Sequence, residues 1–145
     1  VDVIIPWRSE RTIPRWNDAK AQKGREKWQK TAIQAAKQSR RAWDPIVGPV
    51  AKLKDVVKLV KETREDNGVT AILHESARIS FARLPFARAR SIVLVIGPEG
   101  GLTAEEIKAL EEAGGQAVVM GDTVLRTASA GVVALGALGV LTDRW

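Results

Sequence analysis

Two glycine-containing segments of the sequence have the composition of ligand-binding loops. The first, IGPEGGLT, runs from Ile96 to Thr103, and the second, MGDTVLRTASAG, runs from Met120 to Gly131. Glycine lets a backbone approach a ligand closely and adopt a positive φ, although an ordinary turn uses glycine for the same reasons. Neither segment matches the pattern of a P-loop or of a dinucleotide-binding turn, so a phosphate site of those kinds is not indicated.

Two charged residues in these segments are candidates for chemistry. Arg126 stands between Leu125 and an apolar stretch, where a buried guanidinium needs an anion or carbonyl groups as partners. A structural role, in which it bonds loop carbonyls, and a role toward RNA or substrate fit this setting equally well. Glu99 is a weaker candidate for a base, because a carboxylate beside a helix N-terminus also stabilises that helix, and we favour this second role.

The surrounding sequence predicts elements that bring both segments to one edge of a sheet. Thr103 and Glu106 form a T-x-x-E capping box that predicts a helix, and the apolar run Ala128–Leu141 predicts a buried helix. Three short runs that are apolar on both faces are typical of buried parallel strands: Val69–Leu73, Ser91–Ile96 and Gln116–Met120. The predicted fold class is therefore α/β, with a mostly parallel sheet flanked by helices. Ligands in such sheets bind beyond the carboxyl ends of the strands.

The first half of the chain adds a short strand and two helices. Val3–Ile5 is a β-type run, and the polar segment WRSERT after it is predicted to be a loop. A helical pattern runs from Asp18 to Arg41, and a second begins at Leu53 and stops before the Asp66-Asn67-Gly68 turn. In the first helix a small-residue face suits close packing, and an opposite, polar face that includes Lys30, Gln34 and Lys37 stays in water. Residues 74–90 read as an irregular, arginine-containing loop.

Composition narrows the functional classes. The length of 145 residues suits one domain, and the absence of cysteine excludes disulfides and thiolate metal sites. With one histidine, no metal is expected, and the protein is expected to be cytoplasmic because no signal peptide is recognisable. No membrane partner is expected either, since the apolar run is shorter than the roughly 20 residues that a spanning helix needs. A net charge of +6 favours a polyanionic partner such as RNA or DNA.

Four segments together carry a family resemblance. They are SERT at Ser9–Thr12, KWQKTAIQAAKQSRR at Lys27–Arg41, IGPEGGLTAEE from Ile96, and the loop with LRT that leads into a small-residue helix. These segments resemble, in the same order, the RsmE family of 16S rRNA (uracil-N3)-methyltransferases in the α/β-knot (SPOUT) superfamily. The resemblance covers nearly the whole chain.

The resemblance implies a deep trefoil knot near the C-terminus, a homodimer that completes each active site, and S-adenosyl-L-methionine as cofactor. It implies methylation of a uracil N3 in 16S rRNA, either free or in the assembled small ribosomal subunit. Arg126 would stabilise the uracil anion, while Arg11, Arg40 and Arg41 are candidate phosphate contacts. The residues that would form the cofactor site are Leu73, His74, Glu75, Ile96, Gly97, Glu99, Gly100, Gly101, Met120, Gly121, Val124, Leu125, Arg126 and Ala130.

Some features depart from the family pattern. Thr123 stands where the family usually has an arginine and Ala128 where it usually has a glutamate, so no role is carried over to either. The family's proteins begin with a PUA-like barrel and a strand-helix unit that this sequence lacks. Residues 1–145 are therefore expected to be a methyltransferase domain that binds cofactor but methylates rRNA poorly by itself. The alternatives are a non-catalytic RNA-binding knot domain and a relative that methylates tRNA ribose; cofactor binding separates the first of these from an enzyme.

Overall fold

The computed structural model describes residues 1–12 and 18–145, which form two compact units. The first unit comprises Val1–Arg8 and the described part of Ile13–Leu53. The second comprises Lys54–Trp145 together with the four residues Ser9–Thr12. A short piece of the N-terminal chain thus belongs to the unit that holds both glycine-containing loops.

The first unit consists of short parallel strand pairs and one long helix, α1 (Asp18–Gln38). Strand β1 (Val3–Ile4) pairs with β3 (Ile46–Val47), and β2 (Trp7–Arg8) pairs with β4 (Ala51–Lys52). The prediction of a strand at the N-terminus is confirmed. The prediction that WRSERT is entirely a loop is wrong at its first two residues, because their backbone pairs with β4.

Helix α1 ends at Gln38, three residues before the predicted end at Arg41. The amide of Arg41 donates to the carbonyl of Ala36, and the amide of Arg40 donates to that of Lys37. With Arg40 at φ 55°, these two bonds form a Schellman motif, which closes a helix. The local pattern of polar and small residues continues past Gln38, which is why periodicity alone overestimated the length.

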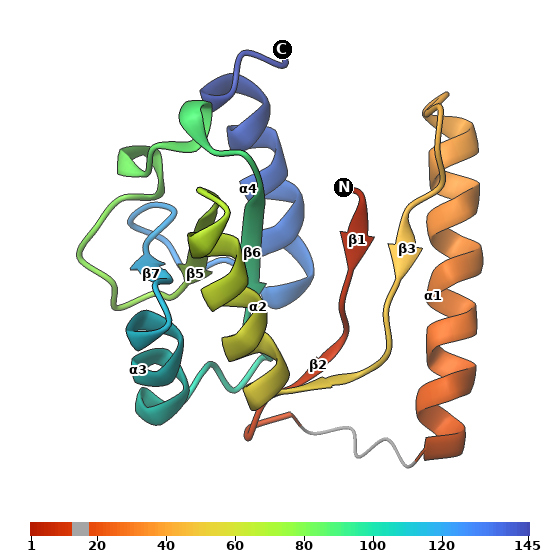
Figure 1. Cartoon of the computed structure of the whole chain (residues 1–145), viewed down its shortest axis with the longest axis horizontal. Coiled ribbons are helices and arrows are strands. Elements are labelled where there is room, and N and C mark those ends of the chain that lie inside the picture. Colours follow the sequence, from red (N-terminus) through yellow and green to blue (C-terminus); the bar gives the residue numbers. More distant parts are fainter. Residues whose placement is uncertain (13–17) are drawn as a thin grey trace. The chain divides into compact units, whose positions relative to one another are not determined.

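The second unit is built on a three-stranded parallel sheet in the order β6-β5-β7 (Figure 1). The strands are β5 (Val69–Leu73), β6 (Ile92–Ile96) and β7 (Gln116–Val118), so all three predicted strands are confirmed. Strand β7 ends two residues earlier than predicted. The backbone of Val119 bonds instead to Ile79 and Phe81, in the segment that connects β5 to β6. The parallel α/β architecture is as predicted, and the trefoil knot stays a prediction.

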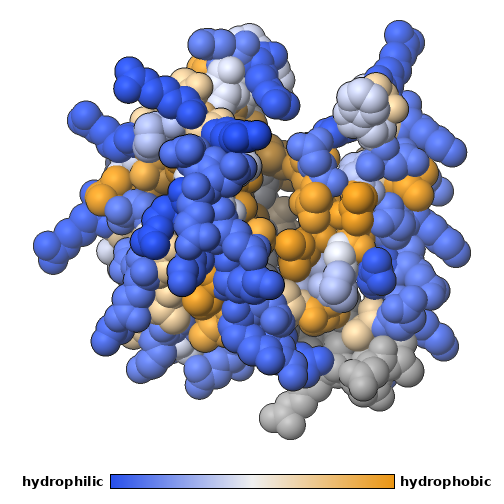
Figure 2. Space-filling view, in the orientation of Figure 1, coloured by the Kyte–Doolittle hydropathy of each residue, from blue (hydrophilic) through white to orange (hydrophobic). Residues whose placement is uncertain are grey.

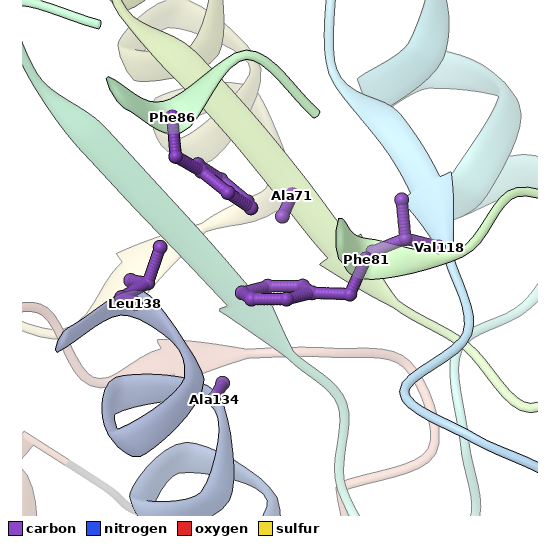
Figure 3. Packing of buried hydrophobic residues seen from close by; sticks show 6 residues of the cluster. All are labelled: Ala71, Phe81, Phe86, Val118, Ala134 and Leu138. Atoms are coloured by element: carbon purple, nitrogen blue, oxygen red, sulfur yellow. The ribbon is translucent and has the colours of Figure 1, made fainter. Parts of the chain in front are cut away.

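One face of this sheet is covered by helix α4 (Thr127–Leu141) and by two aromatic side chains (Figure 3). The rings of Phe81 and Phe86 have centroids 4.6 Å apart. They come from two single-turn 3-10 helices, η1 (Phe81–Arg83) and η2 (Phe86–Arg88). The interpretation of residues 74–90 as an irregular loop is therefore incomplete, since two phenylalanines anchor this segment in the core. The residues of this core are Ala71, Phe81, Phe86, Val118, Ala134 and Leu138.

The opposite face of the sheet is covered by α2 (Leu53–Glu65) and α3 (Ala104–Glu112); Figure 1 shows α2 and α4 on opposite sides of the β5–β6 pair. Buried Val56 and Val60 give α2 its apolar face, and its outward face is hydrophilic (Figure 2). The capping box predicted for α3 is present, with both of its hydrogen bonds. None of the helices in the described ranges is both long and apolar enough to cross a membrane.

Replacing Phe86 tests how strongly the aromatic anchors hold the 74–90 segment. Phe86 is 2% exposed, so Phe86→Ala should lower the free energy of unfolding by about 3–5 kcal/mol through lost burial and a residual cavity. Ile79→Ala, at a side chain that is 40% exposed in the same segment, should cost less than about 1 kcal/mol. Urea denaturation of both variants measures the difference, and equal losses would contradict this packing.

Candidate functional site

The register of the sheet brings three loops to one edge. Leu73 at the end of β5 pairs with Ile96 at the end of β6 on one side and with Val118 at the end of β7 on the other. From β5 the chain goes first to β6 and then, through α3, back across to β7. The carboxyl end of β5 is thus a topological switch point, the place where open parallel sheets bind ligands.

A pocket lies at this switch point. The structure brings together there most of the residues predicted for the cofactor site: Leu73, His74, Glu75, Ile96, Gly97, Gly101, Met120, Val124, Leu125 and Ala130. Their role in binding a cofactor stays a prediction. Four of the predicted residues are not part of the lining: Glu99, Gly100, Gly121 and Arg126.

Sequence reasoning missed five further lining residues, which are Pro98, Leu102, Val119, Thr123 and Thr127. Pro98 and Leu102 lie inside the IGPEGGLT segment. They would have been found if every residue of that segment had been predicted to line the site. Thr123 is one of the two departures from the family pattern and lies in the pocket wall, whereas the other, Ala128, is exposed. The pocket wall therefore includes a threonine at the position for which the resemblance leads one to expect an arginine.

Backbone constraints shape the glycine loop of the pocket. The amide of Gly101 donates to the carbonyl of Pro98 at 2.8 Å, and Gly101 has φ +72°, a conformation that favours glycine. A Cβ atom on Gly97 would lie 3.0 Å from Leu102 Cγ, so the strand end and the loop pack closely. The backbone conformation at Gly101 thus favours glycine, and a larger residue at Gly97 would crowd the Leu102 side chain.

The polar groups at the end of β5 are held in place. The amide of His74 donates to the carbonyl of Val118 at 3.0 Å, and His74 Nδ1 accepts the amide of Ser76 at 3.2 Å. His74 Nε2 lies 4.0 Å from Glu75 Oε2. Within the described residues, no group of three or more His, Cys, Asp or Glu side chains is arranged to hold a metal ion.

The side chains of Arg126 and Glu99, the two candidates for chemistry, are both exposed to solvent. Arg126 is exposed and stands at the N-cap of α4, where its carbonyl accepts the amides of Ser129 and Ala130. The guanidinium of Arg126 is therefore not a buried charge that needs partners within the protein. Glu99 is exposed, and the carboxylate of the capping box of α3 belongs to Glu106; a stabilising role of Glu99 toward this helix stays a prediction.

A buried carboxylate joins the SERT segment to the helix that follows the glycine loop. Glu106 is 3% exposed, and its oxygens accept hydrogen bonds from three donors. These donors are Ser9 Oγ at 3.0 Å, the amide of Glu10 at 2.9 Å and the amide of Thr103 at 2.9 Å. A buried charge is tolerated when its oxygens are satisfied and when it lies at a helix N-terminus, and Glu106 meets both conditions.

The same segment also contacts the glycine loop directly. Arg11 Nη1 donates to the carbonyl of Gly100 at 3.0 Å, and a Cβ atom on Gly100 would lie 3.1 Å from Arg11 Cβ. Of the predicted RNA contacts, Arg11 is thus partly engaged with the protein, and Arg41 Nη2 pairs with Asp2 Oδ1 at 2.7 Å. Arg40 is exposed.

Comparison with known proteins identifies related sequences along almost the whole chain. A family model described as an RNA methyltransferase domain matches residues 1–139. A Mycobacterium tuberculosis protein named ribosomal RNA small subunit methyltransferase E is 42% identical over 144 residues, covering 99% of this chain and 55% of that relative. A Bacillus subtilis protein of the same name is 36% identical over 147 residues, covering 97% of this chain and 56% of that relative. The chain thus spans about half the length of these curated relatives.

Solved structures resemble the chain in fold. A ribosomal RNA small subunit methyltransferase E from Neisseria gonorrhoeae, bound to S-adenosyl methionine, has a TM-score of 0.80 and 31% identity, covering 100% of this chain and 56% of that chain. A Legionella pneumophila protein described as a methyltransferase, in complex with the cofactor SAM, has a TM-score of 0.85 and 28% identity, covering 97% and 55% of the two chains.

Removal of the Glu106 carboxylate should detach the SERT segment. Glu106→Ala leaves three donors unsatisfied and should lower the free energy of unfolding by at least about 3 kcal/mol, since each buried unpaired donor costs about 1–3 kcal/mol. Glu105→Ala is the matched control, because Glu105 is an exposed carboxylate in the same helix turn. Hydrogen exchange at the amides of Glu10 and Thr103 should accelerate only in the Glu106 variant. Unchanged protection of both amides would contradict the role of this carboxylate.

Proposed function

Because the chain belongs to the RNA methyltransferase domain family, we propose that its pocket binds S-adenosyl-L-methionine and that the chain methylates N3 of a uracil in 16S rRNA. The observation that carries this proposal is the pocket formed by the IGPEGGLT and MGDTVLRT loops at the switch point of the sheet. The names of the curated relatives and the bound cofactor of two solved structures support it.

The chemical character of the pocket fits this cofactor. Apolar side chains such as Leu73, Met120 and Leu125 offer a slot for an adenine ring, and the loop backbones offer donors and acceptors for its edges. The sulfonium of S-adenosyl-L-methionine is a cation that favours oxygen neighbours. Among the described residues that line the pocket there is no lysine or arginine, and one carboxylate, that of Glu75, is present.

When bound, the cofactor supplies an electrophilic methyl group on a positively charged sulfur. Uracil N3 must lose its proton before its lone pair can form the new N–C bond, so negative charge develops on the uracil ring. The tasks of the protein are to orient the base in line with the methyl group and to stabilise this charge. Products are the N3-methylated uracil, the demethylated cofactor and the released proton.

Arg126 is the candidate that stabilises the uracil anion. It stands between Leu125 and Thr127, which both line the pocket, and it is exposed. Within the described residues its guanidinium has neither a hydrogen bond nor an ion pair, so it is available to a substrate. Glu99, also exposed, remains a weaker candidate for the base.

The partners proposed are 16S rRNA or the small ribosomal subunit, and a second copy of the chain in a homodimer. Exposed Val132, Leu135 and Val140 give α4 an apolar surface that supports self-association. A cytoplasmic location follows from a ribosomal substrate. Because the chain spans about half of its curated relatives, these partners are proposed for the whole protein.

Enlarging one pocket residue tests where the cofactor binds. Ala130 lines the pocket and is 7% exposed, so Ala130→Leu should occupy the space of the ligand and weaken cofactor binding at least about tenfold. Ala128→Leu is the control, because Ala128 is exposed on the same helix turn and is not part of the lining. Calorimetric titration with the cofactor compares the two variants, after thermal melts have established that both are folded. Wild-type affinity in a folded Ala130→Leu variant would exclude this pocket.

Replacing Arg126 tests the proposed chemistry. Arg126→Ala should reduce kcat by about 10²–10³, as expected when one preorganised donor to a developing anion is lost, while cofactor affinity and stability stay near wild type. Arg144→Ala, which removes another exposed arginine, serves as the control. Methyl transfer to 16S rRNA that lacks the modification is the measurement. A folded Arg126→Ala variant with wild-type turnover would eliminate the role.

A further inference from the structure

The positive charge of the protein is concentrated in one helix and its C-terminal turn. Residues 18–41 hold eight of the 23 basic residues and two of the 17 acidic ones, so this segment carries a net charge of +6, equal to that of the entire chain. The remaining 15 basic and 15 acidic residues cancel. A polyanion that is attracted by the net charge of the protein is therefore attracted mainly to α1 and the turn that follows it.

The contacts of α1 within its own unit define which side of the helix faces outward. Buried Ala32 and Ala36 lie on the inner side. Arg25 Nε donates to the carbonyl of Val47 at 2.8 Å, and the Gln29 side chain accepts the amide of Val47 and donates to the carbonyl of Pro45. At about 100° per residue, positions 25, 29, 32 and 36 share one face, and this face lies against β3.

The outer side of α1 carries a row of lysines. The lysine row consists of Lys20, Lys23, Lys27, Lys30 and Lys37, all of them exposed. Their spacing of three, four, three and seven residues puts them in one stripe about 100° wide, on the side of the helix away from the inner face. The row extends over about 26 Å, at 1.5 Å of rise per residue. Gln34 fills the gap in the row, and the acidic residue beside it is Glu26, which follows Lys23 by three residues and precedes Lys30 by four.

Such a row destabilises the helix unless an anion is present. Like charges three or four residues apart repel one another. Within the described part of the chain, Lys23, Lys27, Lys30 and Lys37 form no ion pair with a carboxylate. Glu26, the acidic residue nearest to the row, instead accepts a hydrogen bond from Gln22 at 3.0 Å. A partner with regularly spaced negative charges would relieve this repulsion along the whole row.

We propose that the lysine row is a docking surface for the phosphate backbone of RNA. A row of about 26 Å is long enough to meet several phosphates of one strand, whereas a single small anion would engage one or two lysines. Lysine ammonium groups act as point charges without the fork geometry that reads base edges, so the contact is independent of sequence. The row positions RNA, and selection of the target base is left to the pocket. RNA as the partner rests on the proposed function.

Neutralising the middle of the row tests this surface with the full chain. The variant is Lys23→Gln/Lys27→Gln/Lys30→Gln, and the matched control is Lys54→Gln/Lys58→Gln/Lys61→Gln, which removes the same charge from exposed lysines of α2. The probe is a fluorescent RNA hairpin, titrated by anisotropy over a series of salt concentrations. We expect affinity to fall at least about tenfold in the row variant, and the slope of log affinity against log salt to flatten by about two units for three lost phosphate contacts. The α2 variant should keep an affinity and a salt slope close to those of the wild-type chain.

Several results would overturn the proposal. These are wild-type affinity and slope in the row variant, equal losses in the two variants, or no binding of the hairpin by the wild-type chain. Tighter row-dependent binding to anionic phosphatidylserine vesicles or to polyglutamate than to RNA would assign the row to a membrane or to an acidic protein instead. Calorimetric titration with the cofactor and a methyl-transfer assay test the pocket independently of the lysine row. Row-dependent RNA binding without either pocket activity would overturn the proposed enzyme and leave the row in place.

Discussion

The parallel pairing of β5 on both of its sides is the constraint on which the site depends. Parallel neighbours cannot be joined by a tight turn, so each connection has to leave the sheet and return. One connection supplies Phe81 and Phe86 to the first face of the sheet, and the other supplies α3 to the second face. Because Leu73, Ile96 and Val118 end in register, the loops that follow these strands are forced into a common space. The pocket is a consequence of that register.

The glycine loop in this space is fixed by the SERT segment as well as by the sheet. Glu106 gathers Ser9, Glu10 and Thr103 around one buried carboxylate, and Arg11 bonds the carbonyl of Gly100. Glycine-rich backbone is entropically costly to order, so such external bonds matter more here than in a loop with large side chains. The SERT segment therefore acts on the pocket through the shape of the loop.

The pocket and residues 18–41 differ in charge. The two proposed ligands, a cationic cofactor and polyanionic RNA, require such a difference. Among the described residues, the pocket lining has no lysine or arginine, which suits a cationic ligand. The excess positive charge lies in residues 18–41, which suits a polyanion. A basic pocket would repel the sulfonium, and a neutral surface would leave RNA to be held by few contacts. The proposed cofactor pocket and the proposed RNA surface therefore lie in parts of the sequence with different charge.

The sequence by itself determined the features that depend on neighbours along the chain. Apolar runs indicated β5, β6 and β7, the T-x-x-E pattern indicated the capped start of α3, and glycines at strand ends indicated the loops of the pocket. These signals are local, because hydrophobic periodicity and caps involve residues a few positions apart. The parallel α/β class followed from them, whereas the specific family followed from resemblance.

Only the tertiary structure decided which distant residues meet. The bond from Ser9 to Glu106 joins positions 97 residues apart, and no periodicity encodes such a pairing. The burial of Phe86, the exposure of Arg126 and the place of Thr123 in the pocket wall also depend on how the connections pack across the sheet. A side chain's burial is set by whatever covers it, and that cover comes from elsewhere in the chain. For this reason local pattern located the loops of the site, while the fold assigned each of their side chains to the pocket, to the protein interior or to solvent.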